Sequence, residues 1–168
     1  MGCNPYLVLP LLLLAALLQT TALPSMTILG VKPEMMLLIV LGWSLLRGVE
    51  EGLLWAFVGG LMLDFFSGGP LGASTLALLA VSFLSGLTRG SVTRASFLLP
   101  MGVALAGTLL FQGLFLLVVQ LARGNVPWAD SLWRVTLPSL AVNTLLMPVV
   151  FQVLAWLDRK TGREEIGW

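Results

Sequence analysis

Asp64 is the one acidic side chain inside an otherwise apolar run of this sequence, the stretch from Leu53 to Phe66. An ionised carboxylate in an apolar environment costs at least about 2.5 kcal/mol, so it normally has a partner or a purpose. Three uses are open: accepting hydrogen bonds from backbone N–H groups, contacting a partner, or handling protons or ions. Turn-forming residues follow directly, so we expect Asp64 to cap the backbone of 67–69 or of the next helix.

The remaining composition excludes most catalytic chemistry. The 168 residues include no histidine, which removes the commonest general base and metal ligand. The single cysteine, Cys3, has no second sulfur with which to form a disulfide or a thiolate cluster. The segment from Ser67 to Pro70 lacks the Gly-Lys-Ser/Thr ending of a phosphate-binding loop. We therefore expect no catalytic residue, no metal site and no cofactor.

The composition is typical of a protein that lipid surrounds. Hydrophobic residues make up 58% of the chain and charged residues 10%, with a mean hydropathy of +0.98. A soluble domain has roughly 25% charged residues, which cover its surface. The nine basic and eight acidic residues give a net charge of +1 and form no basic patch, so nucleic acid is not an expected partner.

Six apolar runs predict an all-α fold, a compact bundle of six transmembrane helices that forms one domain over residues 1–168. Polar corners separate the runs, including a turn at 47–52 and a hairpin at 67–70. Arg134, Pro138 and Pro148 lie in the last run, so we expect an irregular first turn and a kink. The predicted helices cover about residues 5–22, 33–46, 53–66, 71–88, 97–122 and 132–157, before a polar tail at 158–168.

Basic residues predict the orientation of the bundle, because they concentrate in cytoplasmic loops. With the N-terminus inside, six basic residues lie in inner segments and three in outer ones, which favours N-in and C-in. We expect the tryptophans Trp128 and Trp133 at one membrane boundary and Trp156 at the other. The inner set is Arg47, Arg89, Arg94, Arg159, Lys160 and Arg163, and the outer set is Lys32, Arg123 and Arg134.

The first apolar run also resembles a signal peptide in length and in its small residues near position 22. It lacks a basic segment before the apolar stretch. Cys3 precedes that stretch, whereas a lipoprotein cysteine follows it. Tyr6 stands where a myristoylation signal has Ser or Thr. We expect an uncleaved helix.

Small residues at helical spacing predict close contacts between helices. Gly59 and Gly60 lie in the third run, and pairs four residues apart recur at 56/60, 86/90 and 102/106. We expect most of these stripes to pack inside the bundle. Polar residues in the later runs have structural interpretations too. Thr108 and Gln112 are expected to form an interhelical hydrogen bond, and Asn143 or Thr144 to satisfy a backbone group that Pro148 leaves exposed.

The central segment resembles the signature of the rod shape-determining MreD family, in which a glycine-containing helix ends in Leu-x-x-Asp and turns through Ser-Gly-x-Pro-Leu-Gly. Looser agreement extends over the chain: Pro33 and Glu34 open the second helix, where Asp is commoner than Glu, and Asn143 and Pro148 lie in the last. The signature residues here are Gly59, Gly60, Asp64, Ser67, Gly68, Pro70, Leu71 and Gly72.

The resemblance implies a non-enzymatic scaffold in the bacterial inner (cytoplasmic) membrane. Such a subunit of the cell-elongation complex binds the single-span protein MreC. It lies near the RodA glycosyltransferase and its penicillin-binding transpeptidase, whose peptidoglycan synthesis it helps to position or regulate. On this reading the signature residues serve structure or partner binding.

The predicted outline is also similar to the six-helix substrate-binding subunits of energy-coupling-factor transporters, which supply an alternative function. Such a subunit needs an outward-facing pocket with convergent polar groups. The polar residues expected on that side are few, which favours the scaffold. They are Asp64, Ser67, Asn125, Asp130 and Arg134.

Overall fold

The computed structural model describes residues 5–22, 32–88, 98–124 and 131–161, and all regular structure within these ranges is helical. Two short π-helical segments, η1 and η4, adjoin the first and last α-helices. The elements are α1 (Pro5–Leu17), η1 (Leu18–Ala22), α2 (Met35–Arg47), α3 (Val49–Ser67), α4 (Ala73–Leu87), α5 (Leu98–Arg123), η4 (Leu132–Thr136) and α7 (Leu137–Thr161).

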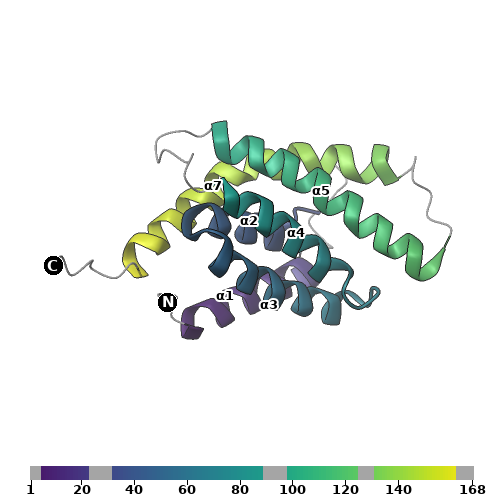
Figure 1. The fold of residues 1–168 in the computed structure, drawn as a ribbon, viewed down its shortest axis with the longest axis horizontal. Helices are drawn as coiled ribbons and strands as arrows, with labels where there is room; N and C mark the ends of the chain where they lie inside the picture. Colours follow the sequence, from purple (N-terminus) through teal and green to yellow (C-terminus); the bar gives the residue numbers. More distant parts are fainter. Residues whose placement is uncertain (1–4, 23–31, 89–97, 125–130, 162–168) are drawn as a thin grey trace.

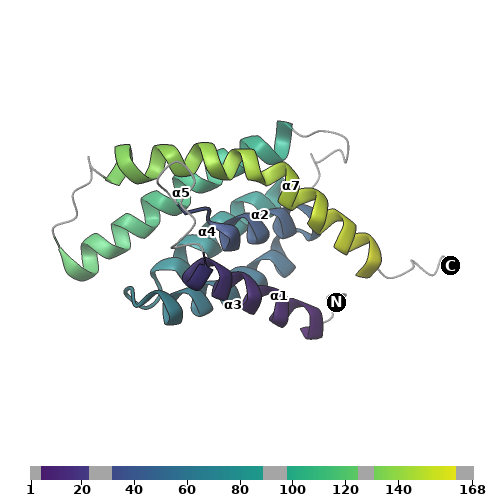
Figure 2. The ribbon, with the colours of Figure 1, turned by 180° about the vertical axis from the view of Figure 1, so that it is seen from behind.

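The helices form three layers (Figure 1). Helices α5 and α7 lie side by side on one face, α1 and α3 lie on the opposite face, and α2 and α4 lie between these pairs. The view from behind shows the same order (Figure 2). Helices α2 and α4 therefore contribute many of the buried side chains of the core. Leu38, Leu41, Leu78 and Val81 are at most 1% exposed.

Successive helices run up and down the bundle. The start of α3 lies against the end of α4, where a Cβ on Gly86 would come within 2.8 Å of the Val49 backbone. Arg47, the last residue of α2, forms an ion pair with Asp158 near the end of α7. The ends of α2, α4 and α7 therefore share one end of the bundle with the start of α3, and the α3–α4 hairpin lies at the other end (Figure 1).

Helix α3 begins at Val49, four residues before the sequence predicts, and the turn predicted at 47–52 is shortened to Gly48. Only Gly48 leaves the helical conformation, with a φ of 92° that favours glycine. Glu50 and Glu51 lie in the first turn of α3, where carboxylates interact favourably with the positive end of the helix dipole. Two acids that resemble a loop in the sequence therefore stabilise a helix start.

Helix α2 is too short to cross a bilayer alone. Its 13 residues span about 20 Å, against about 30 Å for the hydrocarbon core. It begins at Met35, two residues after the predicted start. Non-helical backbone at membrane depth is tolerated only where protein or a water-filled cavity surrounds it. The segment 32–34 meets that condition, because Pro33 is buried and both neighbours line a cavity described below.

Two helical segments are long and apolar enough to span a membrane, Leu98–Ala122 and Leu132–Lys160. The second starts with the π-helix η4, which contains Arg134, so the predicted irregular first turn is confirmed. Pro148 lies in the middle stretch of α7, and Figure 2 shows that this helix changes direction along its length, as the sequence predicts. Pro148 cannot donate to the carbonyl four residues earlier, so the helix bends there.

Apolar side chains cover much of the outer surface within the described ranges. Leu98 is 82% exposed, Leu121 80% and Leu71 71%. The boundary tryptophans agree with this picture, since Trp133 is 73% exposed in η4 and Trp156 is 50% exposed near the end of α7. Trp128 lies outside the described residues. A surface with so many exposed leucines suits lipid as its solvent.

Candidate functional site

Asp64 caps the start of α4. Its Oδ2 accepts hydrogen bonds from the backbone N–H groups of Gly72 (2.9 Å) and Thr75 (3.2 Å) and from the Thr75 hydroxyl (2.7 Å). Its Oδ1 accepts one from the N–H of Ser74 (2.9 Å). The first N–H groups of a helix have no partner within the helix, and a carboxylate also suits the positive end of the dipole. Asp64 is 2% exposed, and of the uses open from the sequence it takes the capping one, at α4.

Gly59 and Gly60 let neighbouring helices approach α3. A Cβ on Gly60 would lie 2.5 Å from the Cα of Thr75, and one on Gly59 would lie 2.7 Å from the sulfur of Met36. Helices α3 and α4 are thus in backbone contact one turn away from the Asp64 carboxylate. Gly86 makes the second backbone contact of the same helix pair, against Val49.

The other signature residues shape the turn between these helices. Gly68 and Gly72 have positive φ values of 63° and 92°, in the left-handed region that favours glycine. The carbonyl of Pro70 accepts a hydrogen bond from the N–H of Ala73 (3.2 Å), which closes the turn. Ser67 and Leu71 are exposed at its edge. The structure thus brings the whole signature together as one capped hairpin.

A second polar cluster joins three helices around Glu34, and the sequence alone does not predict it as a site. The Gln112 side-chain amide donates to Glu34 Oε1, and Asn143 Nδ2 donates to Glu34 Oε2 (3.1 Å). The backbone N–H of Glu34 donates to Asn143 Oδ1 (3.1 Å). Asn143 Nδ2 also lies 3.3 Å from the hydroxyl of Thr108, to which it donates. We call Glu34, Thr108, Gln112 and Asn143 the Glu34 cluster.

The Glu34 cluster forms hydrogen bonds at the start of α2, where the first backbone N–H groups have no partner within the helix. Glu34 precedes the helix, and its two carboxyl oxygens and its N–H all bond to side chains of α5 and α7. Gln19 of η1 contributes a further bond, since its Oε1 accepts the N–H of Met36 (2.9 Å). Polar side chains from three other elements thus replace the water that a surface helix would use.

Two sequence interpretations change here. Asn143 bonds to Glu34 and Thr108, and the hydroxyl of Thr144 is buried without a partner among the described residues, so the predicted repair of Pro148 is wrong. The interhelical bonding predicted for Gln112 and Thr108 is confirmed, but with Glu34 and Asn143 as partners. The sequence does show three polar residues, Thr108, Gln112 and Asn143, within apolar runs. The order of the helices in the sequence does not show that these residues meet in the fold.

The 102/106 pair is an exception to the internal packing predicted for most of the small-residue stripes. A Cβ on Gly102 would meet no atom within 4 Å, and Ala106 is exposed. Both lie on the outer face of α5, which α4 and α7 leave uncovered at this position. Gly90 of the 86/90 pair lies outside the described residues.

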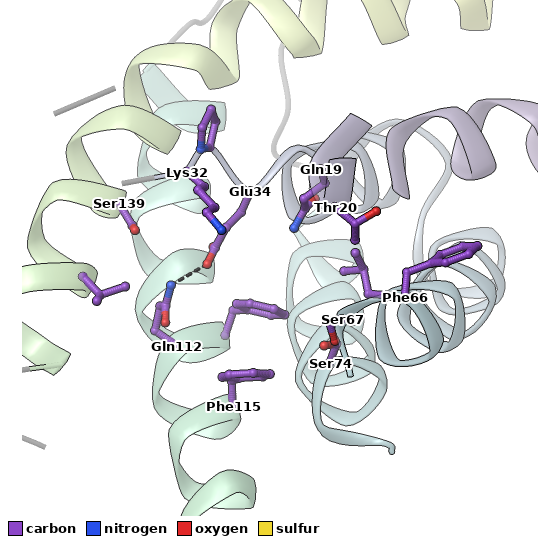
Figure 3. Close-up of a pocket in the computed structure, with 14 residues that line it drawn as sticks. Gln19, Thr20, Lys32, Glu34, Phe66, Ser67, Ser74, Gln112, Phe115 and Ser139 are labelled. Atoms are coloured by element: carbon purple, nitrogen blue, oxygen red, sulfur yellow. Dashed lines mark hydrogen bonds between the residues drawn. The ribbon is translucent and has the colours of Figure 1, made fainter. Parts of the chain in front are cut away.

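A cavity of about 550 Å³ lies beside the Glu34 cluster (Figure 3). Lys32, Glu34, Gln112 and Ser139 come from one side, and Gln19, Phe66, Ser67 and Ser74 face them from the other. Asp64 is not in its lining, although the helix start that it caps supplies Ser74. The polar groups here exceed those expected from the sequence, because Lys32, Glu34 and Gln112 were assigned to helix ends or packing. Asn125 and Asp130 lie outside the described residues.

The opposite end of the bundle holds a charged and aromatic cluster. Arg47 pairs with Asp158 and with Glu51 (3.9 Å), and its guanidinium lies 5.6 Å from the Trp43 ring centre. Trp43 stacks on Trp55 with ring centres 4.3 Å apart, and its Nε1 donates to Glu51 (3.3 Å). These contacts connect α2, α3 and α7. The described residues contain no group of three potential metal ligands, and the polar contacts join helices.

The two helical segments long and apolar enough to cross a membrane, together with the exposed apolar side chains, fit the class of helical membrane proteins. The family model for rod shape-determining protein MreD matches residues 3–157, and the chain belongs to this family. Membership of this family supports a role in rod shape determination and therefore in cell shape. The match does not favour the transport-subunit alternative. No curated protein and no solved structure gives a significant match.

Proposed function

We propose that this protein is a non-enzymatic, multi-pass scaffold of the bacterial inner membrane. In this proposal it binds the single-span protein MreC and helps to position or regulate RodA and its penicillin-binding transpeptidase. The family match over residues 3–157 is the observation that carries the proposal. The polar side chains of the bundle support it, because the Asp64 cap and the Glu34 cluster are engaged in bonds between helices.

The proposed topology has six transmembrane helices with both termini in the cytoplasm. The up-and-down order of the described helices supports it, since the ends of α2, α4 and α7 share one end of the bundle. The basic residues Arg47, Arg159 and Lys160 lie near that end. Basic residues favour the cytoplasmic side, so the α3–α4 hairpin and the cavity would face the periplasm.

The scaffold mechanism rests on rigidity. Two backbone contacts and a four-bond cap hold the α3–α4 hairpin, and the Glu34 cluster holds α2 to α5 and α7. A bundle held at both ends presents its outer helices in a fixed arrangement, which a partner helix can recognise without reordering them. The partner would then transmit this geometry to the synthase.

The test is affinity purification of the tagged full-length chain from its native membrane in a mild detergent, with partners quantified by mass spectrometry. We expect MreC in stoichiometric amounts, together with the elongation synthase. A tagged, unrelated multi-pass protein from the same membrane is the matched control. Recovery of an ATPase pair with a transport subunit in place of MreC would overturn the proposal.

A further inference from the structure

Glu34 is a carboxylate whose partners in the described structure are all neutral. Its two oxygens accept hydrogen bonds from the amides of Gln112 and Asn143, and no ion pair reaches it from the described residues. Amides supply hydrogen bonds but no positive charge, and a partly buried carboxylate is stabilised much further by a nearby cation. Each oxygen keeps a second lone pair, and Glu34 lines the 550 Å³ cavity.

The cavity offers other features that suit a positively charged group beside Glu34. Phe111 and Phe115 line it with stacked rings, whose centres are 6.1 Å apart. Aromatic rings attract cations through their negative faces. Ser139 is 2% exposed, lines the cavity and has no hydrogen bond among those of the described residues, so its hydroxyl is available to a ligand. A protonated amine would therefore meet a carboxylate, aromatic rings and a hydroxyl.

Lys32 adds the opposite charge to the lining of the same cavity. Its side chain is exposed, it forms no ion pair with a described residue, and Figure 3 shows it on the same side as Glu34 and Gln112. An ammonium group binds phosphate as a point charge. The cavity thus presents a negative and a positive group two residues apart, the complement of a ligand that carries an amine and a phosphate.

The rim of the cavity indicates that this ligand is a lipid. Phe66 and Val135 line it and are 47% and 44% exposed. On a membrane protein such apolar rim residues lie against acyl chains, so a head group inside the cavity could keep its tails in the bilayer. The volume lies within the range of roughly 300–1,000 Å³ that small-molecule sites occupy.

We propose that this cavity binds the head group of a phosphatidylethanolamine lipid, with its ammonium at Glu34 and its phosphate at Lys32. Glu34, Gln112 and Ser139 recognise the amine end, beside the stacked phenylalanines. Lys32 holds the phosphate. This site is independent of MreC binding, so its failure would leave the proposed function standing.

The experiment measures lipid retention by native mass spectrometry of the full-length protein, exchanged from detergent into mixed micelles of one lipid at a time. The probes are dioleoyl phosphatidylethanolamine, phosphatidylglycerol, which has no amine, and phosphatidylcholine, whose amine carries no N–H. We expect phosphatidylethanolamine to be retained at least about tenfold more than either other lipid. Soluble phosphoethanolamine should displace it, whereas inorganic phosphate alone should not.

Variants assign the two ends of the ligand. Glu34→Gln should abolish the preference for phosphatidylethanolamine over phosphatidylglycerol, because the amide keeps the size of the side chain and one acceptor oxygen but removes the charge. Lys32→Gln should weaken retention of both lipids, and the control Glu50→Gln, at the other end of the bundle, should change neither. If Glu34→Gln does not fold, Lys32→Gln and Ser139→Ala decide, and normal retention in both would overturn the site.

Other outcomes also count against the proposal. Equal retention of the three lipids by the wild-type protein would overturn it. A preference that survives in folded Glu34→Gln would place the lipid elsewhere. Unselective lipid retention, combined with loss of MreC from Glu34→Gln, would show that a partner residue fills the cavity in place of a lipid.

Discussion

At the scale of single residues, buried polar side chains explain how a bundle that contains such short helices holds together. Asp64 and Asn143 are each almost completely buried, at 2% and 0% exposure, and each bonds to other helices. A buried polar group that loses its partner costs about 1–3 kcal/mol. The two residues therefore allow sharp tests with conservative variants.

Asp64→Leu should lower the free energy of unfolding more than Asp64→Asn. Leucine leaves the N–H groups of Gly72, Ser74 and Thr75 unsatisfied, whereas the asparagine oxygen still accepts from some of them. We expect a loss of about 3 kcal/mol or more for leucine and about 1–2 kcal/mol for asparagine. Reversible unfolding of the purified protein in detergent measures both. Equal losses would contradict the capping role, and folded Asp64→Asn that has lost all partner binding would assign the carboxylate to the partner.

Asn143→Leu should destabilise the bundle, and Thr144→Val should not. Asn143 bonds to the N–H and carboxylate of Glu34 and to Thr108, so its loss strands buried groups on two other helices. Thr144 has a buried hydroxyl without a partner, and valine has nearly the same shape. We expect a loss of about 2–3 kcal/mol for Asn143→Leu and less than about 0.5 kcal/mol for Thr144→Val. Similar values for the two variants would show that the Glu34 cluster contributes little.

The sequence predicts the Asp64 cap much better than it predicts the Glu34 cluster. The capping residue lies eight positions before Gly72, and turn formers separate them, so the partners are local. Glu34 and Asn143 are 109 residues apart. Their meeting depends on how α2, α5 and α7 pack, which apolar runs alone do not specify. For the same reason, the sequence suggests only a local role for Asn143, a hydrogen bond to a backbone group that Pro148 leaves exposed.

At the scale of elements, glycine decides which helices touch. Gly60 and Gly86 place α3 and α4 in backbone contact at both ends of the hairpin, whereas Gly102 of α5 faces open space. Equivalent spacings in the sequence thus have opposite environments. A four-residue spacing of small residues predicts that another helix can approach closely. Whether a helix packs there depends on the fold.

Gly60→Leu and Gly102→Leu form a matched pair that tests this difference. Leucine at Gly60 would overlap the Thr75 backbone and separate α3 from α4, which we expect to cost about 3 kcal/mol and to reduce the amount of folded protein. A Cβ at Gly102 meets no atom within 4 Å, so leucine there should leave stability unchanged or slightly raised, because glycine disfavours helix. Fluorescence size-exclusion chromatography of tagged variants measures the folded fraction. Equal folded fractions for the two variants would contradict the packing.

The helix boundaries show where sequence patterns fail. The apolar runs predict most of the helices to within a few residues, because turns in a membrane protein need polar residues or glycine. The start of α3 is missed by four residues, since Glu50 and Glu51 look like loop residues although they stabilise the first turn of a helix. The sequence does not predict that the start of α2 is buried, because this burial depends on side chains of α5 and α7, which lie far away in the sequence.

At the scale of the whole molecule, the account requires that the two ends of the bundle lie on opposite sides of the membrane. A Cys3→Ser background allows single cysteines to report on this topology. We expect a cysteine at Gly69 in the hairpin to react with a membrane-impermeant maleimide in cells with a permeabilised outer envelope. A cysteine at Lys160 should react only after lysis. The reverse pattern would invert the proposed orientation.

The proposed role as a scaffold for rod shape is tested most directly by depleting the native protein and measuring the shape of the cells. Depletion should turn rods into rounded cells, and wild-type protein or the Gly102→Leu variant should restore the rods. Gly60→Leu should fail to restore them, because its hairpin cannot pack. Two results would contradict this role. In one, cells remain rods although the protein is completely depleted. In the other, Gly60→Leu restores rod shape although no folded Gly60→Leu protein is detected.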